Sequence, residues 1–165
     1  MNGKELAQGI HNKVDEFERL CAGVDEATAS RAPEGRWSPK EIVSHLLGAE
    51  GAGMVAGIRM FLEKDVPEID IVPETTHFSG SRASLTFKQL LEQFKQEYLK
   101  MADLVAGLSP EQLSRTAHVP LFKESPIGEY PSLSAFVGGV ADYHLGFHTD
   151  HMREILQGLG ALQKT

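Results

Sequence analysis

The sequence predicts an all-α protein, a four-helix bundle with a long crossover connection between its second and third helices. Apolar residues recur at spacings of three and four along four long segments, which is the period of an amphipathic helix. Helix-start signals precede these segments. The connection at residues 64–85 is long for a compact domain, and such a connection allows consecutive helices to run parallel.

The first two helices are expected at residues 3–22 and 39–63. One side of the first helix is apolar and carries Leu6, Ile10, Val14, Phe17 and Cys21. The second helix has the clearest start signal, because Ser38-Pro39-Lys40-Glu41 is a capping box. In such a box the Ser38 hydroxyl accepts a hydrogen bond from the helix backbone and the Glu41 carboxylate reaches back, so the helix begins at Pro39.

The third helix is expected from a second capping box, Thr86-Phe-Lys-Gln89, to residue 107. Its inner face carries Phe87, Leu90, Leu91, Phe94, Tyr98, Met101 and Leu104. A single short turn follows at Ser109. The last long helix begins near Ser132 and ends near Gly158 or Gly160, since glycine is a common helix stop. Within the irregular stretch 114–131, residues 119–122 could form a short extended piece.

Size and charge limit the class of protein. A chain of 165 residues, 41% hydrophobic, favours a single domain spanning residues 1–165. With 16 Lys and Arg against 23 Asp and Glu, the net charge of −7 argues against binding to nucleic acid. No apolar stretch makes a good membrane span, because Glu50 and Arg59 interrupt the longest one. The single cysteine, Cys21, forms no internal disulfide, which favours a cytoplasmic location. A homodimer is plausible, although no surface stripe identifies an interface.

Three histidines in the last helix are the strongest functional signal. On a helix, His144, His148 and His151 fall within an arc of roughly 60° that continues the apolar stripe of this segment. Buried imidazoles need a partner for each ring nitrogen, and a metal ion satisfies that need. Because two ligands are too few, the third should come from another helix. His45 is the best candidate, since it also lies within an apolar stripe.

Other interpretations of the histidines stay open. A lone His45 would more often be a hydrogen-bonded core residue. His151 could be a fourth ligand, a hydrogen-bond partner of a ligand, or a pH-sensitive core residue. The remaining histidines, His11, His77 and His118, have no ligand-like neighbours and are interpreted as surface or loop residues.

Several nearby residues have structural explanations. Glu41, one turn before His45, could act as a base or orient a ligand, but the capping box already explains it. Trp37 is placed to pack on the first apolar turn of the second helix. Tyr143 is expected between helices with its hydroxyl toward the site. Glycines within the second and last helices, such as Gly53 and Gly138, indicate close backbone approach or room beside the site.

Two motifs resemble a known family. The segment Trp37-Ser-Pro-Lys-Glu-Ile-Val-Ser-His45-Leu, followed by His144-x-x-x-His148-x-x-His151-Met, is similar to the DinB/YfiT-like superfamily of small bacterial metal-binding four-helix bundles. The resemblance implies a site in which His45, His144 and His148 bind a divalent ion such as nickel, zinc or iron. Family members with known chemistry are thiol-dependent transferases and isomerases that use bacillithiol, mycothiol or glutathione, and others are presumed hydrolases.

The predicted function is that of a metal-dependent enzyme, a small-thiol-dependent transferase or a hydrolase, acting on a small-molecule substrate. No catalytic residue and no organic cofactor site are assigned. The alternative is a non-catalytic stress-related or protein-interaction bundle whose histidines form a structural cluster. A ferritin-like di-iron site is disfavoured, because the paired Glu-x-x-His elements that it needs are missing.

Overall fold

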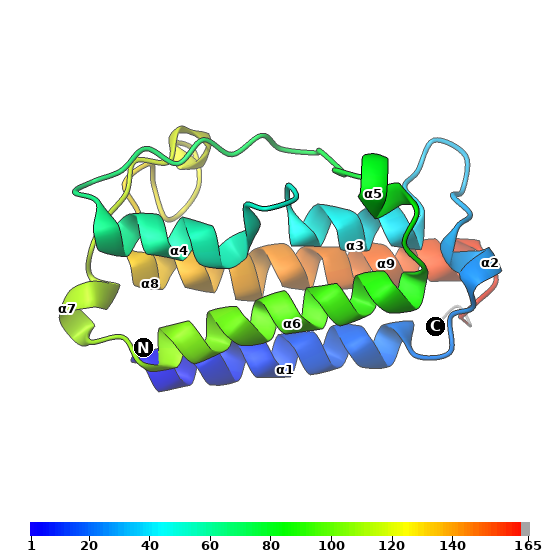
Figure 1. Ribbon diagram of the computed structural model, residues 1–165, viewed down its shortest axis with the longest axis horizontal. Helices are drawn as coiled ribbons and strands as arrows, with labels where there is room; N and C mark the ends of the chain where they lie inside the picture. The colour runs from blue at the N-terminus through cyan, green and yellow to red at the C-terminus, as the bar shows by residue number, and fades with distance from the viewer. Residues whose placement is uncertain (163–165) are drawn as a thin grey trace.

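A computed structural model describes residues 1–162, and every regular element within them is a helix (Figure 1). The elements are α1 Gly3–Cys21, α2 Glu26–Ala29, α3 Pro39–Leu47, α4 Gly53–Glu63, α5 Gly80–Ala83, α6 Phe87–Ala106, α7 Pro110–Leu113, the 3₁₀-helix η1 Pro120–Phe122, α8 Leu133–Gly138, the π-helix η2 Gly139–Leu145 and α9 Gly146–Gly158. The predicted all-α fold is confirmed. Residues 119–122, considered as an extended piece, contain a 3₁₀ turn instead.

The bundle has four rods (Figure 1). Helix α1 packs along α6 and runs antiparallel to it, while α3 and α4 together form one rod and α8, η2 and α9 another. The α3–α4 rod and α6 run in the same direction. The crossover segment, residues 64–79, makes this possible by returning along the length of the bundle from the end of α4 to α5. It therefore passes close to α3, the helix that carries His45.

The expectation of one helix over residues 39–63 is wrong, because the chain breaks at residues 48–52. Gly48, Gly51 and Gly53 have φ values of 74°, 77° and 62°, in the left-handed region that favours glycine. A Cβ at Gly53 would collide with the Glu97 carboxylate. That carboxylate accepts a hydrogen bond from the Val55 backbone N–H at 3.3 Å and so satisfies one free donor at the start of α4. The break separates α3 from α4.

The last rod is continuous but not uniformly α-helical. Residues 139–145 form a π-helix, an arrangement that often occurs at functional sites, and His144 lies within it. Of the two roles expected for the glycines of this rod, close backbone approach or room beside the site, Gly138 does not show the first, because a Cβ there would meet open space. At Gly139 a Cβ would make an ordinary contact with Ile127. These two glycines stand where the α-helix widens into the π-helix.

Side chains from loops and short helices complete the ends of α3, α4 and α6. The predicted capping boxes at Ser38 and Thr86 are confirmed. Arg82, buried within α5, donates to the carbonyls of Ser44 and Gly48 at the end of α3. Arg115 does the same for α4, donating to Phe61 at 2.5 Å and to Lys64 at 2.7 Å.

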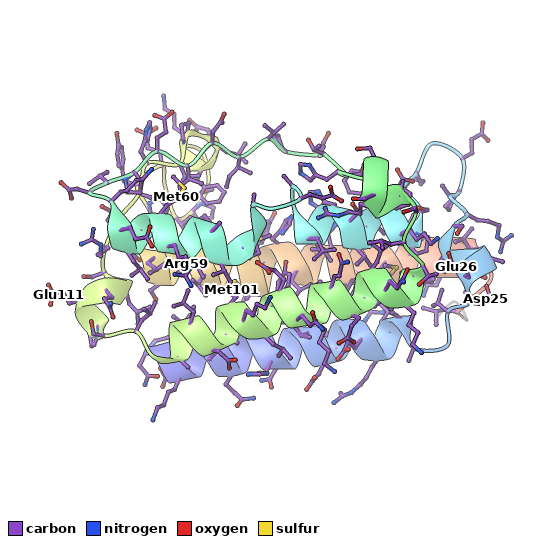
Figure 2. All side chains as sticks on the ribbon, in the orientation of Figure 1. Asp25, Glu26, Arg59, Met60, Met101 and Glu111 are labelled. Carbon is purple, nitrogen blue, oxygen red and sulfur yellow. The ribbon has the colours of Figure 1, made fainter. Side chains whose placement is uncertain are left out.

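The start of α6 is tied to α2 and α3. Glu26 lies on α2 at the end of the bundle where α6 begins (Figure 2). Its carboxylate accepts a hydrogen bond from the Phe87 backbone N–H at 2.8 Å and pairs with the largely buried ammonium of Lys40. These contacts lower the pKa of Glu26, the Lys40 bond being the largest cause. One carboxylate thus joins three helices at this end.

The core runs along the inside of the four rods. The α1–α6 seam contains Phe17 and Phe94, whose ring centroids are 4.9 Å apart, and Tyr98, which donates to the carbonyl of Leu46 at 3.3 Å. Burial of such aromatic side chains contributes much of the folding energy. Among residues 1–162, no helix combines the length and apolar character that a membrane crossing requires.

Candidate metal centre

Three imidazoles from two rods meet at one place. His45 comes from α3, His144 from η2 and His148 from α9. One ring nitrogen from each lies within 4.8 Å of the others, the one such group of His, Cys, Asp and Glu side chains found in the described part of the chain. The ring centroids of His45 lie 5.0 Å from His144 and 4.5 Å from His148. The three predicted site residues are therefore neighbours.

The spacing of the nitrogens suits a shared cation. Nε2 of His45 and Nε2 of His144 are 3.0 Å apart. Two nitrogens bound at about 2.1 Å to one ion, with an angle of about 90–110° between them, lie about 3.0–3.4 Å apart. Three neutral imidazoles are also a donor set that first-row divalent metals accept. The residues present could thus hold such an ion.

A backbone carbonyl determines the tautomer of His45. Nδ1 of His45 lies 2.8 Å from the carbonyl oxygen of Thr75, in the crossover segment. Because a carbonyl can only accept, Nδ1 carries the proton and donates it. Nε2 then has its lone pair free, facing His144. Metal-binding histidines commonly use their second ring nitrogen in this way.

Burial keeps the histidines of the last rod neutral. Desolvation, and secondarily the charge of His45, lower the pKa of His144 to about 4. Desolvation is also the largest cause for His148, whose pKa falls to about 3, with further contributions from His144, His45 and His151. His148 is only 6% exposed. Neutral imidazole is the form that binds metals, so the nitrogens of His144 and His148 are available at neutral pH.

His151 lies behind His148. Their Nδ1 atoms are 3.2 Å apart, so one ring donates a hydrogen bond and the other accepts it. Among residues 1–162, His151 is not one of the histidines grouped within 4.8 Å. Of the three roles open to it, the observed contact is that of a hydrogen-bond partner of a candidate ligand.

Trp37 forms a wall of the histidine cluster. Its ring is parallel to that of His148, with centroids 6.1 Å apart, and its centroid lies 5.1 Å from His45 and 5.7 Å from His151. Its place before the capping box predicts packing on the first turn of the second helix. No local pattern predicts the contacts with His148 and His151, because they join residues more than a hundred positions apart.

A model of the DinB superfamily matches residues 11–156, most of the chain. The chain belongs to the DinB superfamily. YfiT from Bacillus subtilis, described as a probable metal-dependent hydrolase with an unusual four-helix bundle topology, is similar in structure with a TM-score of 0.77 and 16% identity, covering 96% of this chain and 87% of that chain. A protein from Streptococcus pneumoniae has a TM-score of 0.65 and 14% identity, covering 93% of this chain and 90% of its own. No curated protein matches the sequence significantly.

The structure corrects one further prediction about this DinB-superfamily chain and adds to another. Tyr143 does not pack between helices, because 76% of its surface is exposed. His77, predicted to be a surface or loop residue, does lie in a loop, and the same loop carries the Thr75 carbonyl that contacts His45. It is half-buried, and desolvation, then the charges of Arg82 and His45, lower its pKa. No local pattern in the sequence relates this loop to His45.

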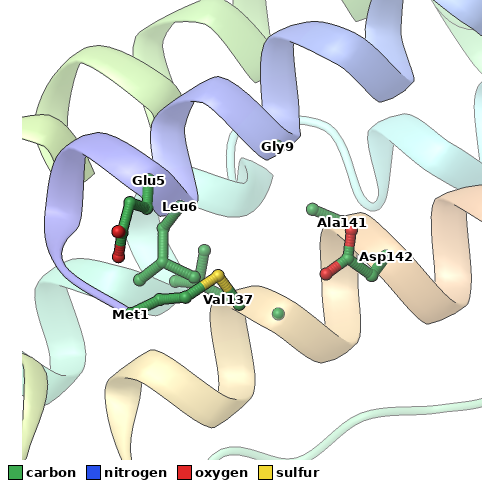
Figure 3. A pocket seen from close by; sticks show the side chains of 8 residues that line it. Met1, Glu5, Leu6, Gly9, Val137, Ala141 and Asp142 are labelled. Atoms are coloured by element: carbon green, nitrogen blue, oxygen red, sulfur yellow. The ribbon is translucent and has the colours of Figure 1, made fainter.

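The remaining features lie outside the cluster or have structural roles. Glu41 accepts a hydrogen bond from the Ser38 backbone N–H at 3.0 Å, which agrees with its capping role. A cavity of about 20 Å³ lies where Leu6 of α1 faces Val137 and Ala141 (Figure 3). None of the clustered histidines lines it, and its volume admits about one water molecule.

Proposed function

We propose that the chain is a metal-dependent enzyme in which His45, His144 and His148 bind one divalent cation, nickel, zinc or iron. The observation that supports this most strongly is the convergence of three imidazole nitrogens within 4.8 Å of one another. Family membership and the structural likeness to a probable metal-dependent hydrolase support the same conclusion. With three protein ligands, such a cation keeps a coordination position for a nucleophile or a substrate.

The proposed reaction is hydrolysis of a small-molecule substrate, with thiol transfer as the second branch. A bound divalent cation supplies a Lewis acid, which lowers the pKa of water toward about 7 or that of a low-molecular-weight thiol. The protein supplies orientation. Thr75 keeps the Nε2 lone pair of His45 free, and Trp37 covers one side of the histidine rings.

Metal content tests the site. Protein purified without added chelator should hold about one divalent ion per chain by elemental analysis, and His144→Ala should lose it. His118→Ala is the control, because His118 pairs with Glu68 and stacks on Tyr130 outside the cluster. Equal metal content in wild type and His144→Ala would contradict the proposed site.

Activity tests the reaction. The metal-loaded protein is compared on model esters in water and on model electrophiles with glutathione, bacillithiol or mycothiol. Turnover that disappears in His148→Ala and depends on the thiol supports transferase chemistry, whereas thiol-independent turnover supports hydrolysis. Absence of both with the metal bound would contradict an enzymatic role.

A non-catalytic bundle is the second candidate, and one observation favours it. His45 pairs with His144, and His148 pairs with His151, so each of these rings has a partner without an ion. If the cluster is only structural, adding and removing divalent metal should leave the melting temperature unchanged.

We also propose a cytoplasmic location, because the thiol of Cys21 is free. Cys21 is 2% exposed, and burial raises its pKa to about 12, so the thiol is unreactive and needs no oxidised partner. The single domain over residues 1–165 and the homodimer stay predictions. Limited proteolysis and sedimentation velocity measure them.

A further inference from the structure

The crossover segment contains an unusual concentration of left-handed backbone. Within the described residues, three residues other than glycine have positive φ values, and all three belong to residues 64–79. They are Val66 at 40°, Glu74 at 57° and His77 at 54°. Positive φ values are uncommon for residues other than glycine. They cluster at functional sites, where the surrounding structure offsets their backbone strain.

Two of these residues flank the carbonyl that binds His45. Glu74 directly precedes Thr75, and His77 follows two positions later, so a left-handed residue stands on each side of the Thr75–Thr76 pair. The Thr75 carbonyl accepts the His45 Nδ1–H at 2.8 Å. With ordinary negative φ values at both positions, the chain would follow a different course here and this carbonyl would turn away.

Hydrogen bonds fix the crossover segment on both sides of the turn formed by residues 74–77. Toward α4, His118 receives the Ile69 N–H and donates its own N–H to Pro67, each bond measuring 2.8 Å. Toward α5, Arg82 binds the carbonyls at the end of α3, and the Ser81 hydroxyl donates to Glu50 at 2.6 Å. The crossover segment is thus attached to the helix that carries His45.

The side chain of Glu74 does not explain its conformation. It is exposed, so it adds little packing to the turn. What the position contributes is therefore its backbone angle. A glycine would adopt that angle without strain, whereas proline, restricted to φ near −65°, cannot adopt it.

We propose that Glu74 and His77 are positioning residues whose left-handed backbone aims the Thr75 carbonyl at His45, holding that imidazole as the Nδ1–H tautomer with Nε2 directed at the metal. The inference rests on the proposed function for the metal, but the hydrogen bond acts on His45 whether or not an ion is bound. The crossover segment thereby becomes part of the site.

A glycine and proline pair at position 74 tests the inference. Zinc affinity is measured by competition with a chromophoric chelator, and the ¹⁵N shifts of the His45 ring report its tautomer in metal-free protein. Glu74→Pro should weaken zinc binding about tenfold or more, the range seen when an outer-shell partner of a ligand is lost. Its His45 ring should also lose the single Nδ1–H signature. Glu74→Gly should keep the tautomer and bind zinc within about twofold of wild type.

The same pair at Val66 is the matched control. Val66 is also left-handed, but it lies beside the bonds to His118 rather than beside Thr75. Val66→Gly should leave the zinc affinity and the His45 tautomer unchanged, and Val66→Pro, which disturbs the attachment at His118 but not the Thr75 carbonyl itself, should change them less than Glu74→Pro does. His77→Gly, which keeps the backbone angle and removes the imidazole, should behave like Glu74→Gly.

Separate outcomes contradict the inference and the proposed function. Equal zinc affinity and tautomer in folded Glu74→Pro and Glu74→Gly would overturn the positioning role, as would an equal loss in Val66→Pro. If wild type bound no zinc while the His45 tautomer still depended on position 74, the metal proposal would fail and the positioning role would stand.

Discussion

The neutral state of the buried histidines makes the metal-free protein sensitive to acid. His144 and His148 have folded-state pKa values of about 4 and about 3, below the usual value near 6.5. The unfolded chain therefore binds more protons than the folded chain once the pH drops below about 6.5. Their contribution to stability is complete above that pH and is lost as the pH falls toward 4 and 3.

We expect the free energy of unfolding of metal-free protein to fall between pH 7.5 and pH 5 by on the order of 2 kcal/mol for each of these two histidines. Urea titrations at both pH values measure it. The double variant His144→Asn, His148→Asn is the control and should show a smaller pH dependence. An equal dependence in the variant would assign the acid sensitivity to other groups.

The two halves of the broken second helix each depend on an arginine from elsewhere in the chain. Arg82 binds the last carbonyls of α3, and Arg115 binds those of α4. A cation at a helix C-terminus is favourable, because unpaired carbonyls accumulate there. The difference between the halves is that the end of α3 carries His45.

Comparing methionine variants of the two arginines should therefore distinguish an effect on stability alone from an effect on both stability and metal binding. Arg82→Met and Arg115→Met should each lower the free energy of unfolding by about 1.5–3 kcal/mol, the usual cost of losing hydrogen bonds to a charged group. Arg82→Met should also weaken zinc binding severalfold, because the end of α3 shifts, whereas Arg115→Met should not. Denaturation curves and chelator competition measure both quantities. Equal zinc affinity in the two variants would show that metal binding does not depend on the contacts of Arg82 with the end of α3.

The candidate site joins three parts of the molecule. His45 comes from the α3–α4 rod, His144 and His148 come from the last rod, and the Thr75 carbonyl comes from the crossover segment. An ion that needs all of these parts for binding is bound only by the folded state, so its binding free energy adds to the free energy of unfolding. In the unfolded chain about a hundred residues separate the ligands.

Zinc at a hundred times its dissociation constant should raise the free energy of unfolding by about 2.7 kcal/mol and, for a chain of 165 residues, the melting temperature by about 5–10 °C. Thermal denaturation with and without zinc measures the shift. His45→Ala should abolish it. Magnesium, which prefers oxygen ligands, serves as the control ion and should have no effect.

Local patterns were sufficient for the starts of several helices and for the candidate ligands. The capping boxes at Ser38 and Thr86 involve side chains and backbone within three positions, so the sequence displays them directly. The periodicity of the last helix likewise marks His144 and His148, because residues one turn apart share a face.

Contacts between distant segments were decided only by the tertiary structure. The approach of Trp37 to His148 and the Thr75 carbonyl at His45 each join parts of the chain that no short-range pattern relates. The break after α3 and the π-helix at His144 were also missed. The periodicity of a sequence describes a single ideal helix. The break after α3 depends instead on a neighbouring rod, because the Glu97 carboxylate of α6 accepts a hydrogen bond at the start of α4.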